Sequence, residues 1–195
     1  MKRIFDLIAS AVGLILLLPL GVLLAVAVKV GSRGPVFYSQ KRVGKNGKDF
    51  KLYKFRTMRS GSDKKGLITV GERDSRITKT GVFLRKYKLD ELPQLLNVLL
   101  GSMSLVGPRP EVRKYVDLYQ GDQRKVLNVK PGITDYASIQ FIDENKILGA
   151  AENPDQTYIN EILPAKLKLN LKYVEHQSFI TDLKIIFQTL LKIIR

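Results

Sequence analysis

Two adjacent carboxylates, Asp90 and Glu91, lie within the stretch RKYKLDELPQLLNVL of a chain whose net charge is +15. A carboxylate pair can supply an oxygen nucleophile and a ligand for a hard divalent cation. The plainer interpretation is a helix start, because acidic residues in a first turn offset the positive end of the helix dipole. Pro93 agrees with that interpretation, since proline is tolerated in a first turn. The rest of the chain must decide between the two.

Composition narrows the chemistry available to this pair. The 195 residues suffice for one domain with a core, and there is no cysteine, so neither a disulfide framework nor a thiolate metal site is expected. The single His176 lies near a hydrophobic C-terminal segment and is expected to pack or to face solvent. Any bound metal would therefore take oxygen ligands, which favours Mg²⁺ or a similar cation.

The excess of 33 Lys and Arg over 18 Asp and Glu predicts an anionic partner. Nucleic acid, anionic lipid and a phosphorylated substrate all fit. Residues 38–59 carry eight positive side chains, one acidic residue (Asp49) and several aromatic rings. That run suits nucleic-acid binding, and it equally suits a solvated edge strand or a surface on a membrane.

The N-terminal segment is long enough to enter a membrane. Residues 7–28 are 22 positions without a charge, which exceeds a typical signal-peptide core. Basic residues flank both ends: Lys2, Arg3, Lys29 and Arg33. Positive flanks stay in the cytoplasm, and Pro19 near the middle would kink a helix. We therefore expect a re-entrant helix-break-helix over residues 1–33, with a single spanning helix as the alternative.

The C-terminal segment, about residues 178–195, also combines an apolar stripe with positive charge. The stripe comprises Phe179, Leu183, Ile186, Phe187, Leu190 and Ile194. The basic residues are Lys184, Lys192 and Arg195. A core helix and an amphipathic helix at a membrane interface both fit this pattern.

Residues 34–195 are expected to form a small helix-rich α/β domain. Two strands should flank the turn GKNGK, and residues 60–80 should form a loop. Thr80 should cap a helix that ends near Lys86, and Gly101 should end a helix over 89–100. Further helices are expected at 112–119, 123–127 and 155–173, with an extended segment after the Pro131–Gly132 turn.

The motifs FYSQKRVGKNGKDFKLYKFRTM, LRKYKLDELPQLLNVLLGSMSLVGPRP and VKPGIT follow the kinked segment in that order. Together they resemble the bacterial sugar transferases, which are small monotopic phosphoglycosyl transferases, over almost the whole chain. Two departures are visible. The QVNGR-like run of many relatives is replaced by a stretch containing Gln140 and Asp143, and Leu18 stands where some relatives have Ser before Pro19.

The resemblance implies transfer of a sugar-1-phosphate from a UDP-sugar to a polyprenol phosphate, usually undecaprenyl phosphate, with release of UMP. It maps the family's catalytic pair onto Asp90 and Glu91. Asp90 would attack the β-phosphorus to give a phosphosugar-aspartate, and the acceptor would attack that intermediate. Mg²⁺, or Mn²⁺ in its place, would be held by Glu91 together with Asp90.

Four basic side chains are the candidates for binding substrate phosphates. Arg85 and Arg109 rank first, because a guanidinium can bind phosphate at two points. Lys54 and Arg56 are weaker candidates, since a basic strand on lipid headgroups would explain them equally well. Backbone donors at the expected helix start at Asp90 would add to this phosphate site.

The resemblance also places the enzyme on the cytoplasmic face of a bacterial inner membrane, in contact with anionic lipids. No nucleic acid is expected, and a homo-oligomer remains open. The main alternative is a membrane-tethered, basic nucleic-acid-binding module, which leaves Asp90, Glu91 and the GPRP turn unexplained. A membrane-surface scaffold is a third interpretation, and it does not explain the carboxylates either.

Overall fold

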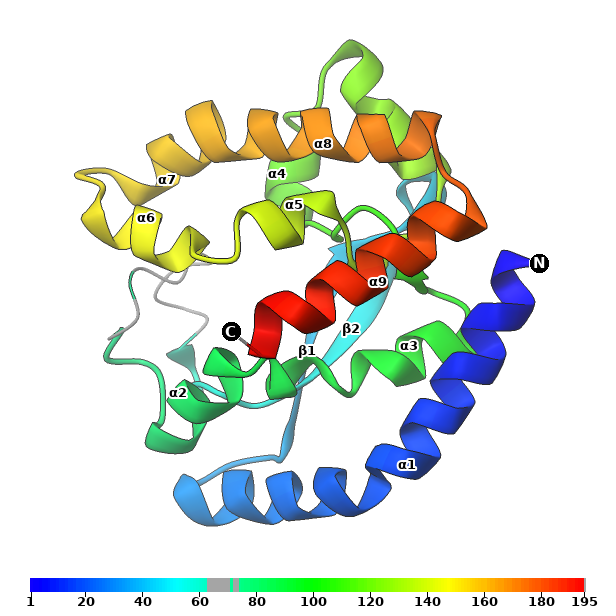
Figure 1. Ribbon diagram of the computed structural model, residues 1–195. Helices are drawn as coiled ribbons and strands as arrows, with labels where there is room; N and C mark the ends of the chain where they lie inside the picture. The colour runs from blue at the N-terminus through cyan, green and yellow to red at the C-terminus, as the bar shows by residue number, and fades with distance from the viewer. Residues whose placement is uncertain (63–70, 72–73, 195) are drawn as a thin grey trace.

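The computed structural model describes residues 1–62, 71 and 74–194. It begins with α1 (Lys2–Gly31), a helix made of apolar residues and unbroken in its assignment, with Pro19 inside it. Figure 1 shows that α1 bends into two arms. Proline removes one helical hydrogen bond and clashes with the preceding turn, which accounts for a bend in this helix. The expected break is therefore a bend within one continuous helix.

The predicted hairpin is confirmed. Strands β1 (Phe37–Val43) and β2 (Asp49–Phe55) pair antiparallel, with Phe37 opposite Phe55 and Val43 opposite Asp49. The connecting turn η1 (Lys45–Gly47) holds Asn46 at a φ of 57° and Gly47 at 72°. Asparagine and glycine tolerate this left-handed region, so the GKNGK sequence suits the turn.

A second sheet consists of two very short strands. Strand β3 (Ser104–Val106) pairs parallel with β4 (Gly132–Thr134). The chains approach so closely here that a Cβ on Gly132 would lie 2.1 Å from the backbone nitrogen of Gly107. Glycine is therefore required, and this contact fixes the GPRP turn against the VKPGIT segment.

The remaining elements are helical. They are α2 (Lys79–Lys86), η3 (Leu89–Glu91), α3 (Gln94–Leu100), α4 (Arg113–Val116), η4 (Gly121–Asn128), α5 (Tyr136–Gln140), α6 (Glu144–Ala150), α7 (Pro154–Thr157), η5 (Tyr158–Ile162, a π-helix), α8 (Leu163–Glu175) and α9 (Phe179–Ile194). The helix-rich α/β class is thus confirmed.

Several expected boundaries were wrong. Thr78, not Thr80, caps α2, because its side chain accepts a hydrogen bond from the backbone N–H of Gly81. The short extended segment predicted at the Pro131–Gly132 turn is confirmed as β4, and α5 and α6 follow it. The loop predicted at 60–80 lies largely outside the described residues. Gly101 ends α3 as expected, at a φ of 91°.

The largest hydrophobic core cluster lies between α8 and the segments beneath it. Its members include Val43, Val116, Tyr158 and Leu167. In Figure 1, α8 and α7 run across the top of the molecule, while α1 curves around the bottom. This cluster is therefore built by the part of the chain that follows α1, whereas Leu24 and Val28 of α1 pack in a separate cluster with Phe55 and Leu84.

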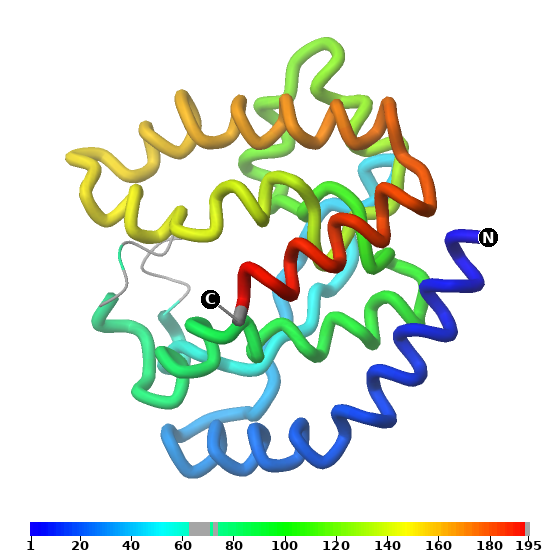
Figure 2. The backbone as a smooth tube through the Cα atoms, in the orientation of Figure 1, coloured from blue at the N-terminus to red at the C-terminus, as the bar shows by residue number. Residues whose placement is uncertain are grey.

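Helix α9 packs on the core through Ile185, which is outside the predicted stripe, and through Ile186, which belongs to it. Its Ile185 is fully buried against Val106 and Tyr173. The stripe residues Phe179, Leu183, Phe187 and Leu190 are exposed, and the side chains of Ile194 and Arg195 lie outside the described part. Figure 2 shows the start of α9 close to the N-terminus, and the rings of Phe5 and Phe179 meet there edge to face at 5.1 Å.

Candidate active site

Asp90 and Glu91 lie on η3, a single 3-10 turn between α2 and α3. Lys88 precedes the turn with a φ of 55°, which reverses the chain and separates η3 from α2. The α-helix begins only at Gln94. The expected helix start at Asp90 is therefore displaced by four residues, and the carboxylates precede it.

Glu91 is held by two cations. Arg109 donates from both guanidinium nitrogens, Nη2 to Oε1 at 2.5 Å and Nη1 to Oε2 at 3.2 Å. Lys54 Nζ donates to Oε1 at 2.8 Å. Burial by itself would raise the pKa of Glu91, but the charges of Arg109 and Lys54 outweigh it and hold that pKa well below its usual range. Glu91 is therefore ionised.

Asp90 has a different environment although it is the next residue. It is buried (6% exposed), and its Oδ2 lies 3.8 Å from Lys54 Nζ. Burial raises its pKa, Lys54 opposes that effect, and the neighbouring charge of Glu91 adds to it. A partly desolvated carboxylate that is only loosely paired suits a nucleophile better than one held by two ion pairs.

The GPRP turn positions Arg109 through its backbone as well as its side chain. The backbone N–H of Arg109 donates to Asp135 Oδ2 at 2.9 Å, and the other oxygen of Asp135 accepts from the backbone N–H of Ser138 at 2.6 Å. Asp135 is fully buried. This residue was missed at the sequence level, because nothing in VKPGITD indicates that its carboxylate reaches a turn 26 positions earlier.

Arg85 also faces the cavity that contains Asp90. Its Nε donates to Thr57 Oγ1 at 2.9 Å. Burial lowers the pKa of Arg85, and the charge of Asp90 is the leading opposing effect, so the two groups are electrostatic neighbours. The structure thus brings together Asp90, Glu91, Lys54, Arg85 and Arg109 around one space, as the sequence predicted.

Arg56 is placed differently from the other three basic candidates. It is buried, and its guanidinium donates to the carbonyl oxygens of Ser32 (2.8 Å), Arg33 (3.0 Å) and Pro35 (2.6 Å). These acceptors follow the C-terminal end of α1. This geometry favours a structural role for Arg56, in fixing the end of α1, over the predicted binding of substrate phosphate.

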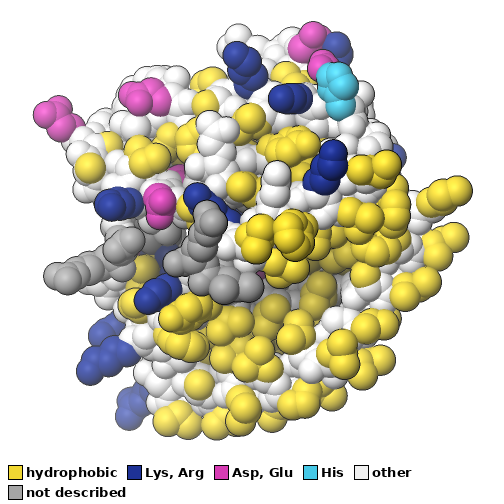
Figure 3. Space-filling model, viewed as in Figure 1, with side chains coloured by type: hydrophobic (Ala, Val, Ile, Leu, Met, Phe, Trp, Pro, Cys, Tyr) yellow, Lys and Arg dark blue, Asp and Glu magenta, His cyan; other side chains and the backbone are white. Residues whose placement is uncertain are grey.

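These charged residues line a cavity of about 1030 Å³, and apolar side chains form another part of its wall. Its polar end is lined by Lys54, Arg85, Asp90 and Arg109, and its other end by apolar side chains of α1, α3 and α9. Figure 3 shows hydrophobic side chains gathered over α1, over α9 and in the recess between them. The cavity can therefore receive a charged group and an apolar chain together.

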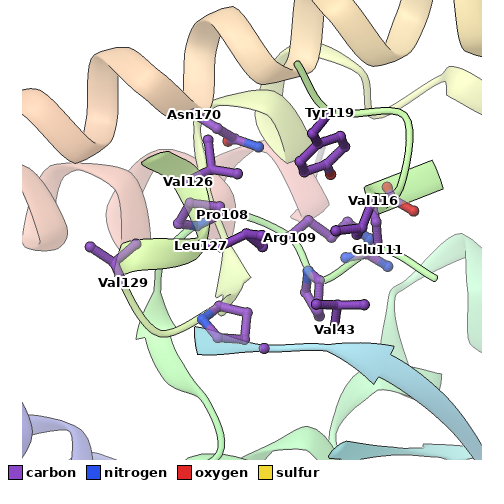
Figure 4. A pocket seen from close by; sticks show the side chains of 13 residues that line it. Val43, Pro108, Arg109, Glu111, Val116, Tyr119, Val126, Leu127, Val129 and Asn170 are labelled. Atoms are coloured by element: carbon purple, nitrogen blue, oxygen red, sulfur yellow. The ribbon is translucent and has the colours of Figure 1, made fainter. Parts of the chain in front are cut away.

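A second, much smaller cavity lies behind the GPRP turn. Figure 4 shows Pro108 and Arg109 on one side of it and Tyr119 and Asn170 on another. Its volume is about 20 Å³, which is room for one water molecule. This space cannot hold a sugar nucleotide, so the large cavity is the candidate site.

Within the described ranges, no three Asp, Glu, His or Cys side chains cluster so as to hold a metal ion. The pair Asp90–Glu91 is therefore the candidate metal-binding set. Two carboxylates are enough for Mg²⁺ when a substrate supplies phosphate oxygens and water completes the shell.

A carboxylate pair set among cations, in a cavity that also has apolar walls, suits the binding of a phosphate group next to an apolar one. The model of the family described as "Bacterial sugar transferase" matches residues 1–195. The chain belongs to this family.

The chain is also similar to several named bacterial proteins. A UDP-N-acetylgalactosamine-undecaprenyl-phosphate N-acetylgalactosaminephosphotransferase of Aeromonas hydrophila is 37% identical over 97% of this chain and 42% of its own length. A UDP-glucose:undecaprenyl-phosphate glucose-1-phosphate transferase of Klebsiella pneumoniae is 41% identical over 98% of this chain and 39% of its own length. The sugar transferase EpsL of Bacillus subtilis is 43% identical over the whole chain and 87% of its own length. The chain thus spans about two-fifths of the first two relatives.

Proposed function

We propose that this protein transfers a sugar-1-phosphate from a UDP-sugar to a polyprenol phosphate, such as undecaprenyl phosphate, and releases UMP. The observation that carries the proposal is Asp90, a buried carboxylate in a cavity that is cationic at one end and apolar at the other. The named activities of the relatives point to the same reaction. It would be the first membrane step in assembling a polysaccharide or another glycoconjugate.

The first half-reaction begins at Asp90. A carboxylate oxygen of Asp90 attacks the β-phosphorus of the UDP-sugar, and the bond from that phosphorus to the bridging oxygen breaks. UMP leaves with the bridging oxygen, and the sugar phosphate is joined to Asp90 as an acyl phosphate. A phosphate oxygen of the polyprenol phosphate then attacks the same phosphorus. The bond to Asp90 breaks, which regenerates the carboxylate and yields a polyprenyl diphosphate-sugar.

The basic side chains stabilise charge at each stage. Arg109 and Lys54 donate hydrogen bonds to Glu91. Together with Arg85 they line the cavity that would receive the diphosphate. Their guanidinium and ammonium groups would bind the β-phosphate oxygens, where negative charge is highest during transfer. Because they also keep Glu91 ionised, the site retains a negative group next to the nucleophile.

Mg²⁺, or Mn²⁺ in its place, would be held by Asp90 and Glu91 and would neutralise part of the charge of the diphosphate when bound. Both oxygens of Glu91 accept hydrogen bonds from cations in the structure. Glu91 would exchange those partners for the metal, and Arg109 and Lys54 would then be free to pair with the substrate. The donor set is thus suited to binding metal and nucleotide together.

The position of α1 supports a re-entrant, monotopic attachment to the membrane. At its start, Lys2 Nζ bonds to Asp182 and Arg3 donates to the carbonyl oxygens of Val98 (2.6 Å) and Leu99 (3.0 Å). At its end, Arg56 binds the carbonyl oxygens described above. One domain therefore holds both ends of α1, whereas a helix that crossed the bilayer would carry its first residues to the other side.

The outer surface of α1 is suited to lipid. Of the helices in the described ranges, only α1 has the length and apolar composition needed to cross a membrane. Its outward side chains are exposed, including Ile15 (72%), Leu16 (73%) and Leu23 (67%). The exposed stripe of α9 would lie at the interface, with Lys184 and Lys192 near anionic headgroups. We infer that the domain sits on the cytoplasmic face of a bacterial inner membrane.

Release of UMP tests the proposal. The detergent-solubilised chain is supplied with undecaprenyl phosphate, Mg²⁺ and each of a panel of UDP-sugars, and UMP is measured. The proposal predicts UMP from at least one UDP-sugar and a lipid product that carries the sugar phosphate. Absence of UMP from every donor, combined with salt-dependent binding of nucleic acid, would instead favour the nucleic-acid-binding alternative.

A further inference from the structure

The apolar end of the large cavity is a groove between α1 and α9, and α3 forms its floor. We call it the α1–α9 groove and define it by the side of α1 at residues 9, 13 and 17, by Leu95 of α3, and by Ile186 and Ile193 of α9. The groove and the space around Asp90 are parts of one continuous cavity. Nothing in the transfer chemistry at Asp90 requires it.

Helix periodicity explains why the groove exists. Ala9, Gly13 and Leu17 recur every four residues and so lie on one face of α1. Two of these three are small, and a Cβ on Gly13 would already lie 3.4 Å from Leu95 Cδ1. The helix is thus narrow where it passes over α3. The neighbouring face of α1, which includes Leu16, points away from the domain and is exposed.

Polar contacts at two positions of α9, Asp182 and Thr189, fix this helix beside the groove. Near the start of α9, Asp182 accepts hydrogen bonds from Lys2 Nζ and from the hydroxyl of Tyr173, which join α9 to α1 and to α8. Further along, Thr189 Oγ1 lies 2.6 Å from Thr134 Oγ1, next to the residue that holds the Arg109 turn. Helix α9 is therefore fixed beside the cavity, and its Ile186, Leu190 and Ile193 form part of the cavity wall.

We propose that the α1–α9 groove binds the first isoprene units of the acceptor, so that the acceptor phosphate lies at Asp90 and the rest of the chain enters the bilayer. This assignment rests on the proposed function. Charge complementarity supports it, since one end of the cavity offers Lys54, Arg85 and Arg109 to a phosphate and the other offers apolar walls. A sugar nucleotide has no apolar segment to fill the groove, whereas a polyprenol phosphate has a charged head on an apolar chain.

The groove also explains how the acceptor could reach the site without leaving the membrane. Its walls, α1 and α9, carry the exposed apolar residues that would face lipid, among them Leu18 and Leu190. A chain could pass from the bilayer between these helices to the catalytic end. Specificity for prenyl chains would then depend on groove volume rather than on any polar contact.

The test fills the groove with a larger side chain. Leu17→Trp places an indole in the groove, and Leu16→Trp, one position along on the exposed face, is the matched control. Two rates are measured for each: exchange of labelled UMP into UDP-sugar, which needs no acceptor, and turnover with long-chain and two-unit prenyl phosphates. For Leu17→Trp, we expect the ratio of long-chain turnover to exchange to fall by about tenfold or more, with a smaller fall for the two-unit acceptor. Leu16→Trp should keep the wild-type ratio.

The outcomes separate the groove from the proposed function. If the wild-type chain exchanges UMP but Leu17→Trp keeps its preference for long chains, the groove assignment is wrong and the transferase proposal stands. If the wild-type chain gives neither exchange nor transfer to any acceptor, the transferase proposal fails first.

Photolabelling covers the case in which Leu17→Trp does not fold. A prenyl phosphate that carries a diazirine near its head should label Gly13 or Leu17 of α1, or Ile186 or Ile193 of α9, in the wild-type chain. Labelling confined to the exposed face around Leu16 would overturn the assignment. Equal competition by ordinary phospholipid would also overturn it, because the groove would then be a general lipid site.

Discussion

The two ends of the large cavity are built by different interactions. At the polar end, hydrogen bonds and ion pairs connect Lys54, Glu91, Arg109 and Asp135 into one chain of contacts. At the apolar end, apolar side chains of three helices form the wall of the cavity, and side-chain size sets the width of the space. Because of this difference, substitutions at the two ends should affect different properties of the enzyme. Loss of one charge at the polar end should affect chemistry strongly, whereas the apolar end should respond to volume and position.

The largest effect is expected from the nucleophile itself. Asp90→Asn keeps the size of the side chain and removes its ionised oxygen, so UMP release should fall by about 10³-fold or more while the chain stays folded. Steady-state UMP release and thermal unfolding are the measurements. Asp117→Asn, an exposed carboxylate outside the cavity, should retain full activity. Near-normal turnover by Asp90→Asn would refute its role.

Glu91 should come next. Glu91→Gln removes the charge that pairs with Arg109 and Lys54 and that would help to hold Mg²⁺, and a loss of about 10²–10³ in rate is expected. Excess chelator should abolish wild-type activity, and Mg²⁺ or Mn²⁺ should restore it. Full activity in chelator would contradict the metal-dependent account.

Two arginines sharpen the comparison, because one serves the reaction and the other serves the fold. Arg109→Gln should lower the rate by about 10²-fold with little change in stability, since it removes a charge that stabilises the transferred phosphate. Arg56→Gln should lower the free energy of unfolding by about 2–4 kcal/mol, because carbonyl oxygens at the end of α1 lose a charged donor. Activity of the folded fraction should remain. If Arg56→Gln lost activity at normal stability, Arg56 would belong with the phosphate-binding residues after all.

The smallest effect on rate is expected from cysteine substitutions at the two ends of α1, which report on which side of the membrane each end lies. The chain has no cysteine, so Ile4→Cys and Arg33→Cys report on the two ends of α1. In intact cells, an impermeant thiol reagent should label neither position, and both should react after the inner membrane is opened. Labelling of position 4 alone from outside would indicate a spanning helix. Pro19→Ala should increase that labelling, since it restores a hydrogen bond and straightens the helix.

Local patterns in the sequence predicted much of this structure. The apolar run at residues 7–28 predicted α1, and the GKNGK turn between two strand-like segments predicted the β1–β2 hairpin. The resemblance predicted Asp90, Glu91 and Arg109 as site residues, and the structure places them along one cavity. Features that depend on distant contacts were not predictable. Strands β3 and β4 have three residues each, too few for a periodic pattern.

The position of Arg56 shows the same limit at the level of one side chain. Its partners follow α1, more than twenty residues earlier in the chain, so a strand pattern could not distinguish it from Lys54. Asp135 is similar, because its role depends on the turn at Arg109. Charge and motif identify which residues gather at the polar end, and only the fold shows that Arg56, which also lines the cavity, binds the backbone after α1.

The covalent intermediate on Asp90 is the central claim, and one trapping experiment tests it most directly. The wild-type chain is mixed with UDP-sugar labelled in the β-phosphate, without acceptor, then quenched and digested for mass spectrometry. The account predicts UMP release of at most one equivalent per chain, label on the peptide that contains Asp90, and loss of that label when polyprenol phosphate is added. Full transfer to acceptor with no labelled peptide at any time, and no UMP release before acceptor is present, would mean that the two substrates react directly and that Asp90 is not the nucleophile.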